Sequence, residues 1–348
     1  MNVVDAIAET AQNWLAPESC WRKRASAEAP EQTGFSPEMI NEAVTLIFSA
    51  LTHEALSKFI VPADAPRKIT HILSGNVPAP GIGSICRGLL LGAENWVKCS
   101  SHDPVFPALF VESLREVNTE LAERVTVKHW PRENVARTKN ALADADAVIA
   151  YGDDDSIASL RALTPVTTKF FGYGHKISFA IVGEEALADR ELPALAAFDA
   201  SVYDQQGCMS PHAFFVEGDA NAFAEKLAIA MEEFQQRVPR GKLSIKEAAL
   251  SARVREIHEF RGAQIWTGKP PYPWTVIYDA QPTFTPSCLN RTVFIKPMHT
   301  LNSMQAWADT ISTIGIAPWN AEMQKLASNL AERICPIGQM QRPPFTSN

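Results

Sequence analysis

The chain has 348 residues, of which 46% are hydrophobic and 20% are charged, and its formal net charge is −7. This length and composition exclude a disordered, collagenous or coiled-coil protein and predict roughly two globular domains. A nucleic-acid-binding surface needs clustered Lys and Arg to neutralise phosphates, so the net negative charge argues against DNA or RNA as a partner.

The sequence has no pattern typical of a membrane span, an export signal or a metal site. The charge-free stretch over residues 69–86 contains Gly75 and Pro78, which predicts no membrane span there. The first basic residue is Arg22, so the amino terminus lacks the order of a secretory signal, and we expect a cytoplasmic protein. No HExxH or CxxC pair occurs, which predicts no metal site and reduced thiols at all six cysteines: Cys20, Cys86, Cys99, Cys208, Cys288 and Cys335.

The expected elements begin after an irregular opening that contains Pro17, Pro30 and Gly34. Ser36 and Pro37 are typical of a helix start, and the apolar residues that follow at helical spacing predict a face that packs on the main body. From residue 68 onward, apolar runs alternate with helical patterns. The expected strands are 69–73, 95–99, 125–129, 147–151, 169–173 and 177–182, and the expected helices are 85–92, 104–123, 133–144, 153–163 and 190–204. This alternation is typical of an α/β fold with a largely parallel sheet.

A second α/β pattern occupies the rest of the chain. Its expected strands are 214–217, 274–279 and 292–296, its expected helices are 219–236 and 244–259, and a last helix and strand precede a Pro-rich tail. We expect the domain boundary within 190–205, which gives domains over residues 1–195 and 196–348.

Few motifs indicate chemistry by themselves. Gly81-Ile-Gly83 begins like a dinucleotide fingerprint but lacks the third glycine, so a glycine-rich turn explains it equally well. No Gly-x-Ser-x-Gly elbow and no phosphate-binding P-loop occur. Cys208 follows a glycine and precedes Met209-Ser210-Pro211, so it lies at a turn where a thiol can face a cleft. From its position alone, Cys208 is better interpreted as an ordinary half-buried cysteine than as a reactive one.

Four segments of the sequence, taken together, favour a reactive role for Cys208. They are Ser74-Gly-Asn-Val-Pro78, Gly88 to Pro104 with Val-Lys-Cys-Ser-Ser-His-Asp-Pro at its end, Gly172-Tyr-Gly-His-Lys-Ile-Ser178, and Gln206-Gly-Cys208, with weaker support from Arg333-Ile-Cys-Pro-Ile-Gly338. Their order resembles the aldehyde dehydrogenase superfamily, and most closely its acyl-CoA reductase branch, the fatty-acyl reductases of bacterial bioluminescence. The resemblance implies an α/β fold with two Rossmann-type parallel-sheet domains and an active site at their interface. Residues 1–195 would be a helical segment plus a dinucleotide-binding domain, and residues 196–348 the catalytic cysteine domain.

The resemblance assigns roles to five residues. Cys208 would be the nucleophile, and the Asn76 side chain and the Cys208 backbone N–H would hold the oxyanion. Lys98, Ser100 and Ser101 would bind the cofactor ribose or its phosphate. Relatives that use NAD often carry a glutamate where Ser101 stands, so its hydroxyl favours NADPH. Without the resemblance, Asn76 is better explained as a turn residue and Lys98 as a surface lysine.

Two departures from the family pattern concern acids. No carboxylate occurs between Asp155 and Glu184, where hydrolytic relatives carry the base that activates water, so we expect slow hydrolysis of an acyl-enzyme. His175 lies in that stretch, and a structural histidine is the favoured interpretation over an acid or base. The segment Ser287-Cys-Leu-Asn-Arg-Thr292 lacks the glutamate that orients the nicotinamide ribose, so no residue is assigned to that role.

The expected activity is therefore NADPH-dependent reduction of an acyl-CoA or acyl-protein thioester, with a fatty acyl chain as the leading substrate and an acyl-protein synthetase as a candidate partner. Two alternatives stay open: an acyltransferase that uses the same cysteine without redox chemistry, and a non-catalytic acyl-binding or scaffold relative. A homo-oligomer is an expectation that no motif supports.

Overall fold

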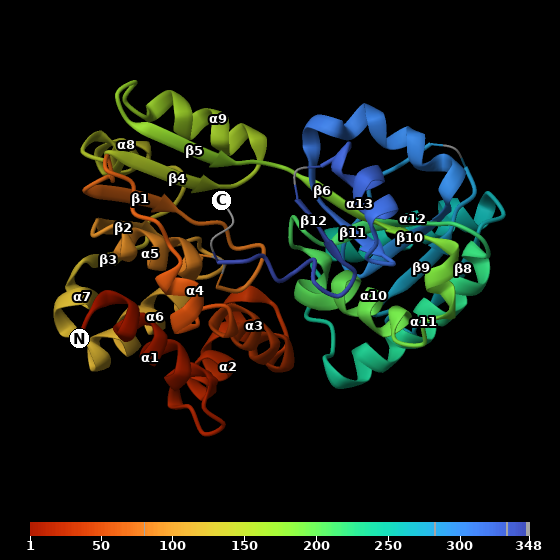
Figure 1. Ribbon diagram of the computed structural model, residues 1–348, viewed down its shortest axis with the longest axis horizontal. Helices are drawn as coiled ribbons and strands as arrows, with labels where there is room; N and C mark the ends of the chain where they lie inside the picture. Colours follow the sequence, from red (N-terminus) through yellow and green to blue (C-terminus); the bar gives the residue numbers. More distant parts are fainter. Residues whose placement is uncertain (80, 282, 332, 346–348) are drawn as a thin grey trace. The chain divides into compact units, whose positions relative to one another are not determined.

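The computed structural model describes residues 1–345 apart from 80, 282 and 332. It divides into two compact units, which are coloured red to green and green to blue in Figure 1. The amino-terminal unit comprises Met1–His175 together with Pro344–Asn348, and the carboxyl-terminal unit comprises Lys176–Pro343. Among the described residues, no helix has both the length and the apolar character that crossing a membrane requires.

The amino-terminal unit contains a five-stranded parallel sheet of order β3-β2-β1-β4-β5. Its strands are β1 (Lys68–Ile72), β2 (Glu94–Lys98), β3 (Val125–Lys128), β4 (Ala147–Tyr151) and β5 (Lys169–Tyr173). The connecting helices are α5 (Gly81–Leu90), α6 (Val105–Val117), α7 (Thr119–Glu123), α8 (Val135–Ala143) and α9 (Asp154–Leu163). Helices α8 and α9 lie on one face of this sheet and α5 and α6 on the other (Figure 1), as expected when β1–β3 and β1–β4–β5 wind in opposite directions.

Four helices precede this sheet: α1 (Val3–Leu15), α2 (Cys20–Thr33), α3 (Pro37–Ser49) and α4 (His53–Ser57). The expected irregular opening is therefore wrong. Asn2 and Ser19 cap α1 and α2, and Pro30 is accommodated inside α2. The expected helix at Ser36 is confirmed as α3. The helical layer packs on the sheet's α6, where Trp14 Nε1 donates to Ser113 Oγ at 2.8 Å.

The carboxyl-terminal unit contains a seven-stranded sheet of order β12-β11-β6-β7-β10-β9-β8, in which only β8 is antiparallel among the described strands. The strands are β6 (Ile177–Val182), β7 (Pro211–Val216), β8 (Gln264–Thr267), β9 (Thr275–Tyr278), β10 (Thr292–Pro297), β11 (Ile311–Ala317) and β12 (Arg333–Pro336). The helices are the 3₁₀ segments η1 (Glu184–Ala188), η2 (Val202–Gln205) and η3 (Met298–Thr310), and α10 (Leu192–Ser201), α11 (Ala220–Arg237), α12 (Ile245–Phe260) and α13 (Ala321–Ser328).

Strand alternation divides the core of this unit between the two faces of its sheet. Ala180 and Phe214 pack with α10 and α11 on one face, and Phe179 and Phe215 pack with α12, α13 and η3 on the other. Strands β8 and β11 are additions to the expected elements. The units divide between His175 and Lys176 rather than between residues 195 and 196, because β6 pairs with β7 and β11 and so belongs to the second sheet.

Candidate functional site

Asn76 lies in the loop that follows β1, at the carboxyl edge of the amino-terminal sheet, and it is exposed. Ser74 Oγ donates to Asn76 Oδ1 at 2.7 Å, which orients the amide by its oxygen. At the other end of the loop, the Ala79 N–H donates to Asp103 Oδ2 at 3.0 Å. Asp103 is buried, and desolvation raises the pKa of its carboxyl to about 6 despite the N–H groups that bond to it.

The loop that follows β2 lies against the Asn76 loop. A Cβ atom on Gly75 would come within 2.6 Å of Ser100 Oγ, so only glycine allows this approach. Lys98 ends β2, with its Nζ 5.6 Å from the Trp130 ring centroid, and burial lowers the pKa of its ammonium group. Ser101 Oγ lies 3.1 Å from His129 Nε2, which follows β3.

These residues fit the phosphate and ribose of a dinucleotide. Parallel sheets of this order bind nucleotides at the carboxyl ends of their strands, where the strand order reverses between β1 and β4. Lys98, Ser100 and Ser101 offer an ammonium group and two hydroxyls at this edge, with the His129 imidazole beside them. His129 had no local sequence signal, because only the β2–β3 pairing brings it to Ser101.

Cys208 lies in the carboxyl-terminal unit, in the turn between η2 and β7, at the amino ends of the parallel strands. Ser178 in β6 fixes this turn, since its Oγ donates to the Cys208 carbonyl at 2.8 Å and accepts from the Thr313 N–H of β11 at 3.1 Å. The predicted position of Cys208 at a turn between a helix and a strand is therefore confirmed.

The surroundings of the Cys208 thiol act on its pKa in both directions. The residue is exposed, yet protein atoms desolvate the sulfur and raise its pKa. Its own backbone N–H, Arg333 and a hydrogen bond with Ser312 lower the pKa by less, so the net shift is upward. Arg333 begins β12, and one of its nitrogens donates to Thr313 Oγ1 at 2.8 Å and to Met209 Sδ at 3.4 Å.

Three other cysteines are buried, and the nearby cations Arg87, Lys98 and Arg333 offset the desolvation of their thiols only in part. Burial raises the pKa of the Cys86 and Cys99 thiols to about 12 and that of Cys335 to about 11, so these thiols are almost wholly protonated at neutral pH. Cys208 and Cys20 are the exposed thiols of the described chain. Cys20 is the first residue of α2 and lies in the other unit.

The structure also describes the two segments that depart from the family pattern. The His175 backbone N–H donates to Asp154 Oδ1 at 2.8 Å, so a carboxylate from α9 does lie against the connection between β5 and β6, already engaged by that N–H. The segment Ser287–Thr292 forms a left-handed turn before β10, in which Leu289, Asn290 and Arg291 have φ values of 63°, 55° and 59°.

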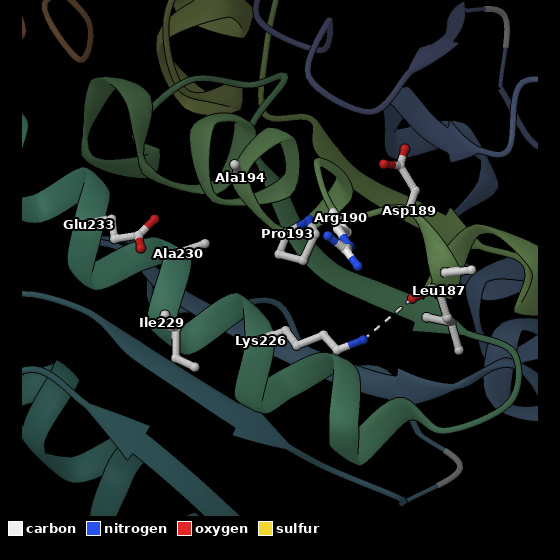
Figure 2. A pocket seen from close by; sticks show the side chains of 10 residues that line it. Leu187, Asp189, Arg190, Pro193, Ala194, Lys226, Ile229, Ala230 and Glu233 are labelled. Carbon is white, nitrogen blue, oxygen red and sulfur yellow. Dashed lines mark hydrogen bonds between the residues drawn. The ribbon is translucent and has the colours of Figure 1, made fainter.

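Figure 2 shows a pocket of about 310 Å³ on the carboxyl-terminal unit, between residues 187–194 and α11. Lys226 crosses its floor and donates from Nζ to the Leu187 carbonyl at 3.4 Å. The pocket follows the carboxyl ends of β6 and β7, whereas Cys208 precedes β7, and none of the expected site residues lines it. It is therefore separate from the candidate site.

The expected residues thus form two groups. Asn76, Lys98, Ser100 and Ser101 come together at the carboxyl edge of the first sheet, and Cys208 stands in the second unit. Three residues around the thiol, Ser178, Ser312 and Arg333, had been given no role from the sequence, although two of them lie in segments that carry the resemblance. The one sequence feature that these three residues share is their position, since each is the first or second residue of a parallel strand.

Comparisons with known proteins agree on family and fold. The family model described as acyl-CoA reductase (LuxC) matches residues 61–344. A long-chain acyl-protein thioester reductase from Aliivibrio fischeri is 26% identical over 97% of this chain and 76% of its own length. Long-chain acyl-protein thioester reductase 2 from Photobacterium leiognathi is 30% identical over 78% of this chain and 58% of its own length.

Solved structures extend the fold assignment. Aldehyde dehydrogenase 21 from Physcomitrella patens has a TM-score of 0.75 at 12% identity, covering 97% of this chain and 78% of its own. Glyceraldehyde-3-phosphate dehydrogenase GapN from Methanocaldococcus jannaschii, solved with NADP, has a TM-score of 0.70 at 13% identity, covering 97% and 80%. The aldehyde-dehydrogenase-like α/β fold is confirmed. The chain belongs to the acyl-CoA reductase (LuxC) family, which is the family and the enzyme class that its motifs indicated.

Proposed function

We propose that this protein reduces a long-chain fatty acyl thioester to the aldehyde, through a covalent intermediate on Cys208 and with NADPH as the reductant. Family membership and the names of the relatives support an acyl thioester as the substrate. The observation that carries the proposal is the Cys208 turn. The residue is exposed, and its thiol bonds to Ser312 and lies within the field of the Arg333 guanidinium.

Acylation is the first step. The Cys208 thiolate attacks the carbonyl carbon, and the resulting oxyanion accepts hydrogen bonds from the Asn76 amide and the Cys208 backbone N–H. The C–S bond to the donor then breaks, and the departing thiolate takes up the proton that Cys208 released. The Ser74 contact supports this role for Asn76, because it engages the amide oxygen and directs the NH₂ group to other acceptors.

A reduced nicotinamide, when bound, supplies the hydride that converts the acyl-cysteine to a thiohemiacetal. Cys208 then leaves as the thiolate, the carbonyl re-forms and the aldehyde departs. Water competes poorly for the acyl-cysteine, because the 172–178 segment carries no carboxylate base and Asp154 beside it already accepts the His175 N–H.

Lys98, Ser100 and Ser101 would hold the adenosine ribose and its 2′-phosphate. The hydroxyl of Ser101 and the neighbouring His129 repel no phosphate, whereas a carboxylate at this position would. The acyl donor is CoA or an acylated partner protein such as an acyl-protein synthetase, and the two share the thioester that Cys208 attacks.

The test compares wild type with Cys208→Ala and the matched control Cys20→Ala, which removes the other exposed thiol. Each variant receives tetradecanoyl-CoA and NADPH, and aldehyde and NADPH consumption are measured together. We expect equal molar amounts of both in wild type and Cys20→Ala, and none in Cys208→Ala. Aldehyde formation that survives in Cys208→Ala would contradict the covalent step, and acyl transfer to an added thiol without NADPH consumption would favour the acyltransferase.

A further inference from the structure

Two left-handed turns stand at the amino ends of the neighbouring strands β7 and β10. Tyr203, Asp204 and Gln205 have φ values of 55°, 50° and 64°, and a second run of three at 289–291 has values from 55° to 63°. Neither run contains glycine, although side chains disfavour this backbone. Such conformations persist where surrounding contacts enforce them, and they cluster at functional sites.

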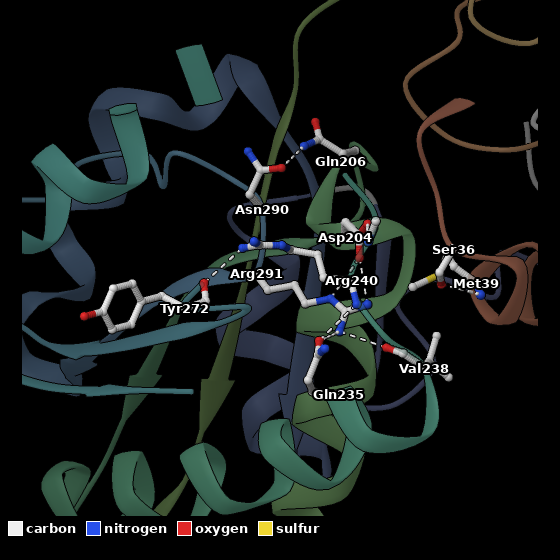
Figure 3. A network of polar contacts seen from close by, with 11 residues as sticks. Ser36, Met39, Asp204, Gln206, Gln235, Val238, Arg240, Tyr272, Asn290 and Arg291 are labelled. Atoms are coloured by element: carbon white, nitrogen blue, oxygen red, sulfur yellow. Dashed lines mark hydrogen bonds and ion pairs between the residues drawn. The ribbon is translucent and has the colours of Figure 1, made fainter. Parts of the chain in front are cut away.

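Side chains join the two turns (Figure 3). Arg291 Nε donates to Asp204 Oδ1 at 2.9 Å, and a second guanidinium nitrogen lies 2.7 Å from the same oxygen, with both side chains buried. Gln206 Nε2 donates to Asn290 Oδ1 at 2.9 Å. We call these contacts between residues 204–206 and 290–292 the turn clamp.

Gln205 belongs to the clamp, and its side chain also bonds to the backbone beyond Cys208. Its Oε1 accepts from the Thr292 N–H at 2.8 Å, and its Nε2 donates to the Pro211 carbonyl at 2.8 Å. The side chain therefore closes the segment 205–211 into a loop with Cys208 at its centre.

Further bonds tie the clamp to the end of α11. Arg291 donates to Gln235 Oε1 at 2.8 Å and to the Val238 carbonyl at 3.0 Å (Figure 3), and Asp204 Oδ2 accepts from the Gly241 N–H at 2.9 Å. A buried ion pair is weak evidence for stability, since apolar residues of similar volume often do as well. Its place beside a strained turn indicates another role.

We propose that the turn clamp positions Cys208, and that Asp204, Gln205 and Arg291 are positioning residues for its acylation. The clamp fixes the backbone of the Cys208 turn, and with it the direction of the thiol and of the Cys208 N–H toward the substrate carbonyl. The inference rests on the proposed function for its chemistry. It also gives the segment Ser287–Thr292, which lacks the ribose-binding glutamate of the wider superfamily, a role in holding the nucleophile.

The central variant is Asp204→Asn, which keeps the shape and the Oδ1 acceptor but removes the charge. Its matched control is Asp279→Asn, because Asp279 pairs with Lys296 at 2.9 Å and is similarly buried, but at the carboxyl ends of β9 and β10. Asn290→Gly is a milder variant that removes the Gln206 contact and still allows the left-handed backbone.

Two quantities are measured on the full chain, well below each melting temperature. One is the single-turnover rate of Cys208 acylation by tetradecanoyl-CoA, and the other is hydrogen exchange of the backbone over residues 205–211. We expect about 10- to 100-fold slower acylation and faster exchange in Asp204→Asn, a smaller change of the same sign in Asn290→Gly, and wild-type values in Asp279→Asn.

Wild-type acylation in folded Asp204→Asn and Asn290→Gly would overturn the clamp, as would an equal loss in Asp279→Asn. If wild-type protein takes no acyl group from CoA, the acyl-CoA donor of the proposed function fails. The exchange measurement then decides on the clamp alone: unchanged exchange over 205–211 in Asp204→Asn overturns it, and faster exchange there with wild-type exchange in Asp279→Asn supports it. Should Asp204→Asn not fold, Asn290→Gly carries both measurements.

Discussion

The six cysteines of this chain have the same chemistry and very different surroundings. Burial raises the pKa of three of them to about 11 or 12. Desolvation also raises the pKa of the Cys208 thiol, but this residue is exposed, and its backbone N–H, Arg333 and Ser312 lower that pKa in part. Arg333 donates to a hydroxyl, a thioether and two backbone carbonyls. Its charge lowers the pKa of the Cys208 thiol, and it also acts on the Cys335 thiol and the buried Asp199 carboxyl.

Replacing Arg333 by Met should therefore raise the pKa of the Cys208 thiol, because the cation stabilises the thiolate. At pH 7, alkylation by iodoacetamide should slow roughly three- to tenfold, while the rate at high pH stays that of wild type. The measurement is the pH profile of Cys208 alkylation, with Arg333→Lys as the control that keeps the charge. An unchanged midpoint in Arg333→Met would assign the arginine a purely structural role.

Asn76→Ala should slow Cys208 acylation by about a hundred- to a thousandfold, the usual cost of losing one oxyanion donor. Ser74→Ala keeps the amide and loses only its orientation by the serine hydroxyl, so we expect a smaller loss. Single-turnover acylation followed by mass spectrometry measures both. If Asn76→Ala acylates within threefold of wild type, the oxyanion is held by other groups.

At this scale the sequence could offer candidates for the nucleophile and the cofactor residues, because these candidates lie in local motifs. It could not indicate His129, Ser178 or Ser312, because each acts on a site residue from another strand and only the strand order places it there.

At the scale of elements, the alternation of short apolar segments with helical patterns predicted β1, β2 and β4 to within one residue. Of these three strands, β4 comes nearest to the apolar run expected of a parallel strand buried on both faces. Helix α2 escaped prediction because its sequence is polar around most of its circumference and contains Pro30. Strand β8 also escaped, since it is a short, partly exposed edge strand with only a weak apolar pattern.

Asp103 links two of these elements, since its Oδ2 holds the Asn76 loop and its Oδ1 accepts the Phe106 N–H at the start of α6. Its pKa of about 6 in the folded chain exceeds the ordinary value of about 4. The folded chain therefore binds this proton more tightly, and the stability that protonation contributes is lost as the pH rises through 6.

The free energy of unfolding of wild type, relative to that of Asp103→Asn, should thus fall by about 1 to 2 kcal/mol between pH 5 and pH 8. Urea titrations of both proteins at four pH values across this range measure the difference. A difference that is constant or rises with pH would show that the carboxyl is ionised throughout.

At the scale of the whole molecule, the two units place their candidate residues at opposite edges of their own parallel sheets. The residues proposed to bind the dinucleotide lie at carboxyl ends, where the general rule for open α/β sheets places such sites. Cys208 and its neighbours lie at amino ends, so that rule would have missed them. The position of Cys208 at a turn made it a candidate, and the family resemblance gave it the role of nucleophile. The expected boundary at 195/196 falls inside the second unit, within α10, because β6 continues the regular strand–helix alternation of the first unit.

Ser101→Glu tests the assignment of the cofactor to the first unit. A carboxylate there accepts a ribose hydroxyl but repels a 2′-phosphate, so the ratio of kcat/KM for NADPH to that for NADH should fall at least about tenfold. Ser101→Ala is the control and should change the ratio much less. A ratio unaffected by glutamate would place the 2′-phosphate elsewhere.

The central claim is that Cys208 carries the acyl group, and the intact mass of the protein after incubation with a panel of acyl-CoAs, without NADPH, tests it most directly. We predict one acyl increment per chain with long-chain donors, removable by hydroxylamine or an added thiol, absent from Cys208→Ala and present in Cys20→Ala. Addition of NADPH should then release the increment as aldehyde. An increment that persists in Cys208→Ala would contradict the account.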